Sequence, residues 1–391
     1  MSGNDPKRPS EPQLAGILRR PVGTPARLPT GGMMAVQSQV EVAPERSVVD
    51  LTLAATPNTP SPATTPMPRP STSQAFELPG YEVIRFFGQG GMGEVFLADR
   101  LSDTGVNVRC VVKTIREGMG DRSQFENLFL DEARIVSQLR HPNIVSVLDV
   151  GRANGRLYLA MEWIEGVDAG ELTRRAAQHG GDIPLTHVLY IVQETLKGLH
   201  YAHTARGSDG SPLGIVHRDI SPGNVLISRH GAVKLADFGV AVAKTAHTAG
   251  SAESLAGKPH YFAPELWRRQ RAGPSTDVFA LGVTCFELLT SRPLFSRDKD
   301  IPALAFEICE FRVDSLLGEM LSLPDGLENI LRRALHENPA ERYASALEFL
   351  EDVNDYAFEQ GIRLLDTHFG EYVARMLEPP STETRRRLWK G

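Results

Sequence analysis

The expected secondary structure of this chain changes once, near Gly166, and this change restricts the possible folds more than any other feature. Before it lie five runs of aromatic and β-branched residues separated by Gly and Asn turns, a pattern typical of strands: YEVIRFFG, GEVFLAD, VRCVVKTI, NIVSVLDVG and LYLAMEWI. Apolar residues at helical spacing predict one helix among them, from Arg122 to Gln138. Helices predominate afterwards: Leu185 to His203, Asp277 to Leu289, Leu327 to Leu335, Ala344 to Phe358 and Gly361 to Met376. The sequence therefore predicts an α+β fold with a small β-rich part and a larger α-rich part, and ligand clefts favour such a junction.

The first 75 residues differ in composition from the rest of the chain. They contain 13 of the 27 prolines and no aromatic residue or cysteine. Such a segment cannot bury enough apolar surface to offset the entropy lost on ordering, so we expect residues 1–75 to be a disordered arm. Five of its hydroxyl residues precede a proline: Thr24, Thr56, Thr59, Ser61 and Thr65. A solvated tail is the simpler interpretation, and the alternative is a site for a protein partner or for an enzyme that phosphorylates the arm.

Net charge and cysteine content exclude several classes of protein. The formal net charge of -6 disfavours a general nucleic-acid binder, so we expect protein or small-molecule partners and no nucleic acid. Three widely spaced cysteines, Cys110, Cys285 and Cys309, fit neither a disulfide framework nor a zinc site and favour reduced thiols in a cytosolic protein. The longest apolar run, Val278 to Phe286, is too short to span a bilayer. We therefore expect a soluble, cytoplasmic protein.

Glycines in FGQGGMGEVF place Gly88, Gly90 and Gly93 at GxGxxG spacing, followed by Val95. This spacing alone is weak, because plain turns and dinucleotide-binding folds also contain it. A dinucleotide fingerprint joins a strand to a helix, whereas these glycines join one predicted strand to the next. A glycine hairpin lets backbone N–H groups approach phosphates without a Cβ clash. The sequence thus predicts a phosphate-binding loop between the first two strands.

Several polar residues beyond this loop are suited to phosphate chemistry. Lys113 ends a β-branched strand, and Glu132 lies on the following helix where it can pair with the ammonium. Either residue taken singly is more often a solvated surface charge. In HRDISPGN, Asp219 can accept a proton from a hydroxyl, while Asn224 and the Asp237 of ADFG offer the hard oxygen ligands that Mg²⁺ prefers. Together these residues predict a divalent-metal phosphate site.

From about Tyr81 to about Asp355 the chain resembles the eukaryotic-type (Hanks-type) protein kinases, most closely the bacterial serine/threonine branch. The matching residues follow the family's order: Gly88, Gly90, Gly93, Lys113, Glu132, His217, Arg218, Asp219, Asn224, Asp237, Phe238, Gly239, Ala263, Pro264, Glu265, Asp277 and Arg342. The resemblance implies a bilobal kinase domain over residues 81–355, with a small lobe at 81–161 and a larger lobe at 166–355. A short helical extension and a basic tail would then occupy residues 356–391.

The resemblance also implies a role for each matching residue, with ATP and Mg²⁺ as cofactors. Lys113 would hold the α- and β-phosphates and be fixed by Glu132, Asp219 would position and deprotonate the acceptor hydroxyl, and Asn224 and Asp237 would hold Mg²⁺. The nucleotide-binding set is Phe87, Gly88, Gly90, Gly93, Val95, Val111, Lys113, Glu162, Ile164, Asp168 and Leu226. Within this set, backbone groups of Glu162 and Ile164 would meet the adenine edge and Asp168 the ribose, behind a gatekeeper at Met161. Asp277 would brace the catalytic loop, and Arg342 would pair with Glu265.

The catalytic loop departs from the family pattern at Ser221, where the serine/threonine kinases usually have a lysine. A second departure is Lys258, which stands before Ala-Pro-Glu where a threonine is usual. In similar kinases that lysine and that threonine meet beside the catalytic aspartate, so the two changes amount to an exchange of ammonium and hydroxyl. We hypothesise that Lys258 supplies the charge and Ser221 the hydroxyl. A charge aimed at the transferring phosphoryl group is expected to change the rate by about a hundredfold or more.

The activity implied is that of a serine/threonine protein kinase in signal transduction, which transfers the γ-phosphoryl of ATP to protein hydroxyls and autophosphorylates. One alternative is a pseudokinase scaffold that binds ATP without transferring a phosphoryl group, and Ser221 is the argument for it. The other is phosphotransfer to small molecules, which the full activation segment disfavours. Tyrosine specificity is disfavoured because ISPGN lacks the alanine/arginine pattern of tyrosine-specific loops.

The chain between Asp237 and Glu265 is expected to be regulated by phosphorylation. In similar kinases the arginine before the catalytic aspartate, here Arg218, clamps a phosphorylated activation loop, and a phosphate is the anion that an arginine can order. The hydroxyls expected to serve are Ser251 or Ser254, with Thr248 next.

Overall fold

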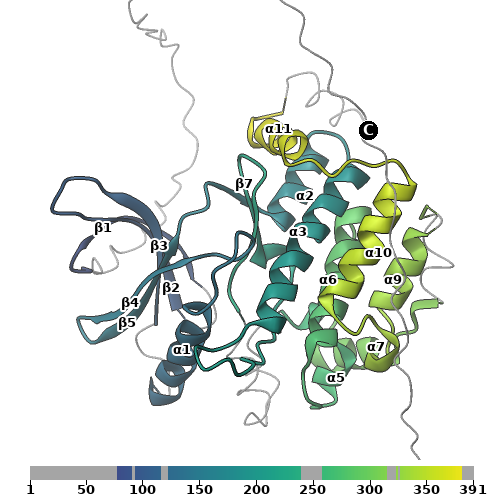
Figure 1. Ribbon diagram of the computed structural model, residues 1–391, viewed down its shortest axis with the longest axis horizontal. Helices are drawn as coiled ribbons and strands as arrows, with labels where there is room; N and C mark the ends of the chain where they lie inside the picture. Colours follow the sequence, from purple (N-terminus) through teal and green to yellow (C-terminus); the bar gives the residue numbers. More distant parts are fainter. Residues whose placement is uncertain are drawn as a thin grey trace, which may run out of the picture. The chain divides into compact units, whose positions relative to one another are not determined.

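The computed structural model describes residues 77–89, 93–115, 122–238, 258–314, 323–324 and 326–380. These residues form two lobes, a β-sheet lobe with one helix and a larger, mainly helical lobe (Figure 1). The predicted α+β architecture is confirmed. No helix among the described residues is both long and apolar enough to cross a membrane.

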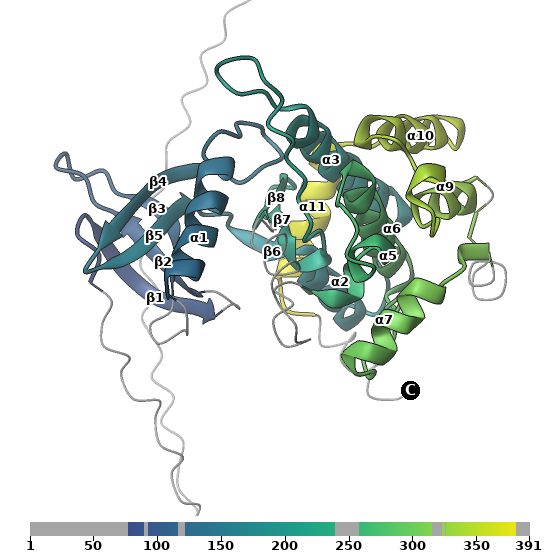
Figure 2. The ribbon, with the colours of Figure 1, turned by 90° about the horizontal axis from the view of Figure 1, so that it is seen from below.

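The small lobe is a five-stranded antiparallel sheet in the order β1-β2-β3-β5-β4. Its strands are β1 (Tyr81–Gln89), β2 (Gly93–Arg100), β3 (Val108–Ile115), β4 (Val147–Ala153) and β5 (Arg156–Glu162). Helix α1 (Arg122–Val136) covers one face of the sheet (Figure 2). Phe129 and Ala133 on this helix pack with Ile115 and Leu159 of the sheet, because the apolar residues of α1 recur at helical spacing. This packing holds α1 against the central strand β3.

The larger lobe is built around α6 (Pro274–Thr290), which is buried along almost its whole length. The other helices are α2 (Ala169–Gln178), α3 (Leu185–Thr204), α5 (Pro264–Trp267), α7 (Ile301–Glu310), α9 (Leu327–Ala334), α10 (Ala346–Glu359) and α11 (Asp366–Leu377). A small sheet of β6 (Gly166–Asp168), β7 (Val225–Ser228) and β8 (Val233–Leu235) lies on the side of this lobe that faces β5 (Figure 2). One parallel bridge, between Ile144 and Leu235, joins the lobes beside this sheet.

The structure corrects the predicted helix boundaries at one place and adds elements that were not predicted. The helix expected from Gly361 begins only at Asp366, since Gly361 takes a left-handed φ of 66° that ends the previous helical turn. Helices α2, α5 and α7 and the small sheet were not predicted. Helices α2 and α7 each begin at an aspartate whose carboxylate accepts a backbone N–H three residues on, Asp168 for α2 and Asp300 for α7.

Candidate functional site

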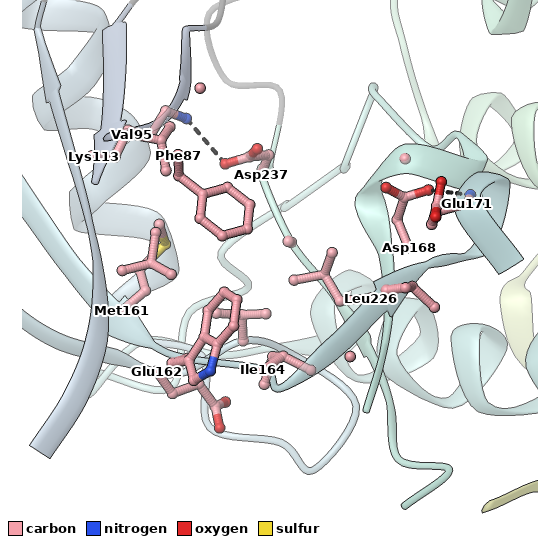
Figure 3. A pocket seen from close by; sticks show the side chains of 18 of the residues that line it. Phe87, Val95, Lys113, Met161, Glu162, Ile164, Asp168, Glu171, Leu226 and Asp237 are labelled. Carbon is pink, nitrogen blue, oxygen red and sulfur yellow. Dashed lines mark hydrogen bonds and ion pairs between the residues drawn. The ribbon is translucent and has the colours of Figure 1, made fainter. Parts of the chain in front are cut away.

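A pocket of about 700 Å³ opens between the two sheets of the structure (Figure 3). Nine of the predicted nucleotide-binding residues line it: Phe87, Gly88, Val95, Val111, Lys113, Glu162, Ile164, Asp168 and Leu226. Its walls are mostly apolar near Met161, and charged where Lys113 faces Asp237. The rings of Phe87 and Trp163, which both line the pocket, meet edge to face with centroids 5.4 Å apart. An apolar slot with a charged end is a suitable shape for a base that carries phosphates.

One predicted residue of the glycine loop, Gly93, is not where it was expected. Gly93 does not line the pocket; it begins β2, where an added Cβ would overlap the carbonyl oxygen of Thr114 on β3. The close approach of these two strands therefore requires glycine at position 93. Gly90 lies outside the described residues, as do the predicted phosphorylation sites Thr248, Ser251 and Ser254.

Lys113 joins the two lobes at the charged end of the pocket. Its Nζ donates to Glu132 Oε1 of α1 at 2.9 Å and to Asp237 Oδ1 at 3.0 Å. Burial alone would lower the pKa of Lys113, but the carboxylates of Asp237 and Glu132 raise it, so the side chain is an ammonium. The charge of Lys113 in turn lowers the pKa of Asp237, against the effect of burial. The pocket thus holds a fixed cation and an ionised carboxylate side by side.

Asp277, from the buried helix α6, holds the backbone of the catalytic loop. Its carboxylate accepts the N–H of His217 at 2.8 Å and that of Arg218 at 2.7 Å, while the ring of His203 lies 2.8 Å away. Burial works against the charged form of Asp277, yet His203 and these N–H donors lower its pKa below the usual range. Arg218 and Asp237 both adopt left-handed backbone conformations, with φ of 66° and 53°. This conformation costs free energy in a non-glycine residue. At Arg218 the hydrogen bond that its N–H donates to Asp277 offsets the cost.

Asp219 lies beyond this brace, between Asn224 and Lys258. The amide of Asn224 donates to Asp219 Oδ2 and to the Asp219 carbonyl, both at 2.7 Å, and the backbone N–H of Lys258 lies 3.3 Å from Oδ1. Burial raises the pKa of Asp219, and the charge of Lys258 opposes that rise. A partly desolvated carboxylate held by two donors has the character of a general base.

The structure brings Lys258 and Ser221 together, although 37 residues separate them. Lys258 Nζ donates to Ser221 Oγ at 2.7 Å and to Asn224 Oδ1 at 3.0 Å. Ser221 is fully buried. A Cβ at Gly223 would lie only 2.7 Å from Lys258 Nζ, so the small residue at position 223 leaves room for the ammonium. An ammonium and a hydroxyl therefore lie beside Asp219, with the lysine coming from the segment before Ala263.

The oxygen atoms of Asn224 and Asp237 are the candidate ligands for Mg²⁺. Within the described ranges no cluster of three or more His, Cys, Asp or Glu side chains is placed to hold a metal ion. Mg²⁺ is commonly bound by only one or two protein oxygens together with the phosphates of a nucleotide. The amide oxygen of Asn224, which accepts a hydrogen bond from Lys258 Nζ, and the ionised carboxylate of Asp237, which pairs with Lys113, are donors of this type.

Glu171 and Arg175 line the pocket but were not predicted. Both belong to α2, a helix that the sequence analysis did not predict. A capping pattern marks its start, because Asp168 accepts the N–H of Glu171 at 2.8 Å, three residues along the chain. The pair Asp168 and Glu171 was thus the signal that would have revealed this wall of the pocket.

The comparison with known families and structures agrees with this geometry. Residues 81–353 match the family model described as "Protein kinase domain". Tyrosine-protein kinase MasK of Myxococcus xanthus is 36% identical over 280 residues, which is 71% of this chain and 43% of that protein. Serine/threonine-protein kinase PrkC of Bacillus subtilis is 32% identical over 273 residues, covering 70% of this chain and 40% of that protein. The chain thus spans about two fifths of the length of these curated relatives.

Among solved structures, the kinase domain of PknI from Mycobacterium tuberculosis superposes with a TM-score of 0.51 at 29% identity. The match covers 71% of this chain and 96% of that domain. The two-lobed architecture is accordingly the protein kinase fold, and the predicted resemblance is confirmed. The chain belongs to the protein kinase family.

Proposed function

We propose that this chain is a serine/threonine protein kinase that transfers the γ-phosphoryl group of ATP to hydroxyls of protein substrates and of itself. The observation that carries this proposal is the position of Lys113, whose ammonium lies within 3.0 Å of Glu132 on one side and Asp237 on the other. In protein kinases the lysine–glutamate ion pair must be in place together with an aspartate positioned to hold Mg²⁺, and Glu132 and Asp237 occupy these two positions. An ATP-binding scaffold has no need of the Asp219 arrangement that accompanies them.

Each residue of the site then has a part in the reaction. Lys113 would bind the phosphates, and Asn224 and Asp237 would hold Mg²⁺, which would neutralise phosphate charge there. Asp219 orients the acceptor hydroxyl and accepts its proton. The chain contributes position and charge rather than covalent chemistry, and these effects account for most of the catalysis in phosphoryl transfer.

Lys258 is proposed to replace the lysine that Ser221 displaced from the catalytic loop. Its ammonium lies 2.7 Å from Ser221 Oγ, and its N–H faces the carboxylate of Asp219. A cation at this position is available to the transferring phosphoryl group. The relocated charge supports an active enzyme over a pseudokinase, because the ammonium that is missing at position 221 is supplied from position 258.

The acceptor is proposed to be serine or threonine, and tyrosine is the second candidate. PrkC and several other relatives are named as serine/threonine kinases, whereas MasK, at 36% identity, is named as a tyrosine kinase. The loop ISPGN lacks the tyrosine-specific pattern, and this favours serine or threonine. Identification of the phosphorylated amino acid separates the two candidates.

Regulation through Arg218 is proposed as well. Its guanidinium Nε is buried and has no hydrogen-bond partner among the described residues, and burial lowers its pKa. A phosphate on Ser251, Ser254 or Thr248 would supply the missing acceptor. We also propose a cytoplasmic location, and a partner or second kinase that acts on the arm at residues 1–75.

Incubation of the purified chain with γ-labelled ATP and Mg²⁺ tests the proposed activity. The expected result is label on serine and threonine of the chain and of an added protein substrate, and none with Asp219→Asn. Measurement of ATP binding by calorimetry accompanies the assay. Tight binding without transfer in the unmodified chain would establish the pseudokinase, and label on tyrosine alone would establish the second candidate.

A further inference from the structure

Helix α11 lies outside the part of the chain that matches the family model, which ends at residue 353. Four of its side chains, Phe369, Tyr372, Val373 and Met376, are nevertheless almost completely buried in the core of the larger lobe. Aromatic contacts join it to α3, where the ring of His187 lies 4.5 Å from that of Tyr372. The helix is therefore an integral part of the folded domain.

Two elements that α11 touches also form a wall of the nucleotide pocket. It packs against α2, which carries Glu171 and Arg175 of the pocket lining, and against β7, which carries Leu226 (Figure 1). The contact at the end of β7 is unusually close. A Cβ at Gly370 would lie 2.6 Å from the carbonyl oxygen of His230, in the turn between β7 and β8. Displacement of α11 would thus disturb both elements.

Arg175 makes the most direct connection between α11 and the pocket. Its Nη1 donates to the carbonyls of Met376 at 3.3 Å and Leu377 at 3.2 Å, and its Nε donates to Glu171 Oε1 at 2.7 Å. The last carbonyls of a helix have no partner within it, and a cation at that end also complements the helix dipole. One guanidinium thus caps α11 and fixes a carboxylate of the pocket wall.

We propose that α11 braces the nucleotide pocket and that Arg175 is the positioning residue through which it does so. The inference rests on the proposed function, since it concerns the site where ATP is expected to bind. Arg175 sets the position of α2, and the start of α2 carries both Asp168 and Glu171 at the pocket. A partner that captured α11 would, by the same route, weaken nucleotide binding.

The neighbouring Arg174 provides a matched control for Arg175. It lies on the same helix and also pairs with Glu171, but its side chain is 61% exposed and no contact joins it to α11 within the described residues. Arg175→Ala is expected to weaken binding of ATP and Mg²⁺ about tenfold, which corresponds to about 1.4 kcal/mol, the scale of one charged hydrogen bond. Arg174→Ala is expected to bind ATP as the unmodified chain does. Arg175→Lys keeps a donor and should fall between them.

Hydrogen exchange of residues 366–377 tests the same coupling without any substitution. If docking of α11 favours ATP, then ATP must stabilise α11 by the same free energy, because linkage is reciprocal. The amides of α11 are expected to exchange more slowly when ATP and Mg²⁺ are present. Gly370→Ala, which forces α11 away from His230, should reproduce the loss of ATP affinity, whereas Gly181→Ala, placed in open space, should not.

These measurements separate this inference from the proposed function. An unmodified chain that binds no ATP overturns both. A chain that binds ATP equally well with and without Arg175→Ala, and whose α11 exchange is unchanged by nucleotide, overturns the brace alone. If Arg175→Ala does not fold, the exchange measurement on the unmodified chain and the Gly370→Ala variant decide the question.

Discussion

Asp219 occupies a largely desolvated position where neighbouring charges control its ionisation. Burial favours the protonated carboxyl, and the ammonium of Lys258 favours the ionised form that accepts a proton. Lys258 therefore has two proposed effects, one on the pKa of Asp219 and one on the phosphoryl group. A pH profile distinguishes the first from the second.

Lys258→Ala is expected to move the acidic limb of the pH dependence of kcat/KM to higher pH. Removal of the ammonium leaves burial unopposed, the pKa of Asp219 rises further, and protonation at Asp219 then abolishes activity at a higher pH than before. Lys258→Arg keeps the charge and should leave the limb near its original position. An acidic limb at the same pH in both variants would show that Lys258 does not act on Asp219.

Arg342 and Glu265 form a buried ion pair, and we predict that its role is structural. Two bonds of 2.9 Å join them, and their side chains are 0% and 4% exposed. Arg342→Ala leaves the Glu265 carboxylate buried without its partner, and the free energy of unfolding should fall by about 3–5 kcal/mol. Arg109→Ala breaks an exposed pair with Asp99 and should leave stability nearly unchanged. Denaturant titration measures the free energy of unfolding of both variants. Equal values would contradict a structural role for the Arg342–Glu265 pair.

Strand and helix signals differ in how much of the fold they predicted. The five strands of the small lobe and helices α1, α3, α6, α9 and α10 were predicted within a few residues, because each carries a long apolar pattern with a clear period. Helix α2 was missed because its central run TRRAA contains no large apolar residue, which weakens the apolar pattern. The strands β6 to β8 are three or four residues long, too short to show alternation. Capping aspartates, not periodicity, mark the starts of α2 and α7.

Substitution of Gly93 tests how closely β2 must pack against β3. Gly93→Ala places a methyl group against the Thr114 carbonyl and should destabilise the chain by about 1–3 kcal/mol, the usual cost of overpacking. Gly88→Ala is the control for stability, because no atom of the described residues lies within 4 Å of the added Cβ. Thermal unfolding of the two variants is the measurement. A similar melting temperature for both would mean that the strands can separate at this point without cost.

At the scale of the whole molecule, the site joins residues from distant parts of the chain. Lys113, Glu132, Asp219, Asp237 and Lys258 come from both lobes and meet within hydrogen-bonding distance of one another or of shared neighbours. No periodicity predicts such a meeting, since period and composition act locally. The order of motifs did predict it, by resemblance to the family. The link between α11 and the pocket was not predicted, because it depends on backbone carbonyls, which carry no sequence signal.

Substitutions at the two positions that differ from the family pattern, 221 and 258, test most directly the claim that the active-site ammonium has moved to Lys258. We expect Lys258→Thr to lower kcat at saturating ATP by about a hundredfold or more, because a charge directed at the transferring phosphoryl is lost. The double variant Ser221→Lys, Lys258→Thr returns the usual family arrangement and should recover most of the lost rate. Calorimetry must show that both variants still bind ATP. An unchanged kcat in Lys258→Thr, or a double variant no faster than the single one, would contradict the account.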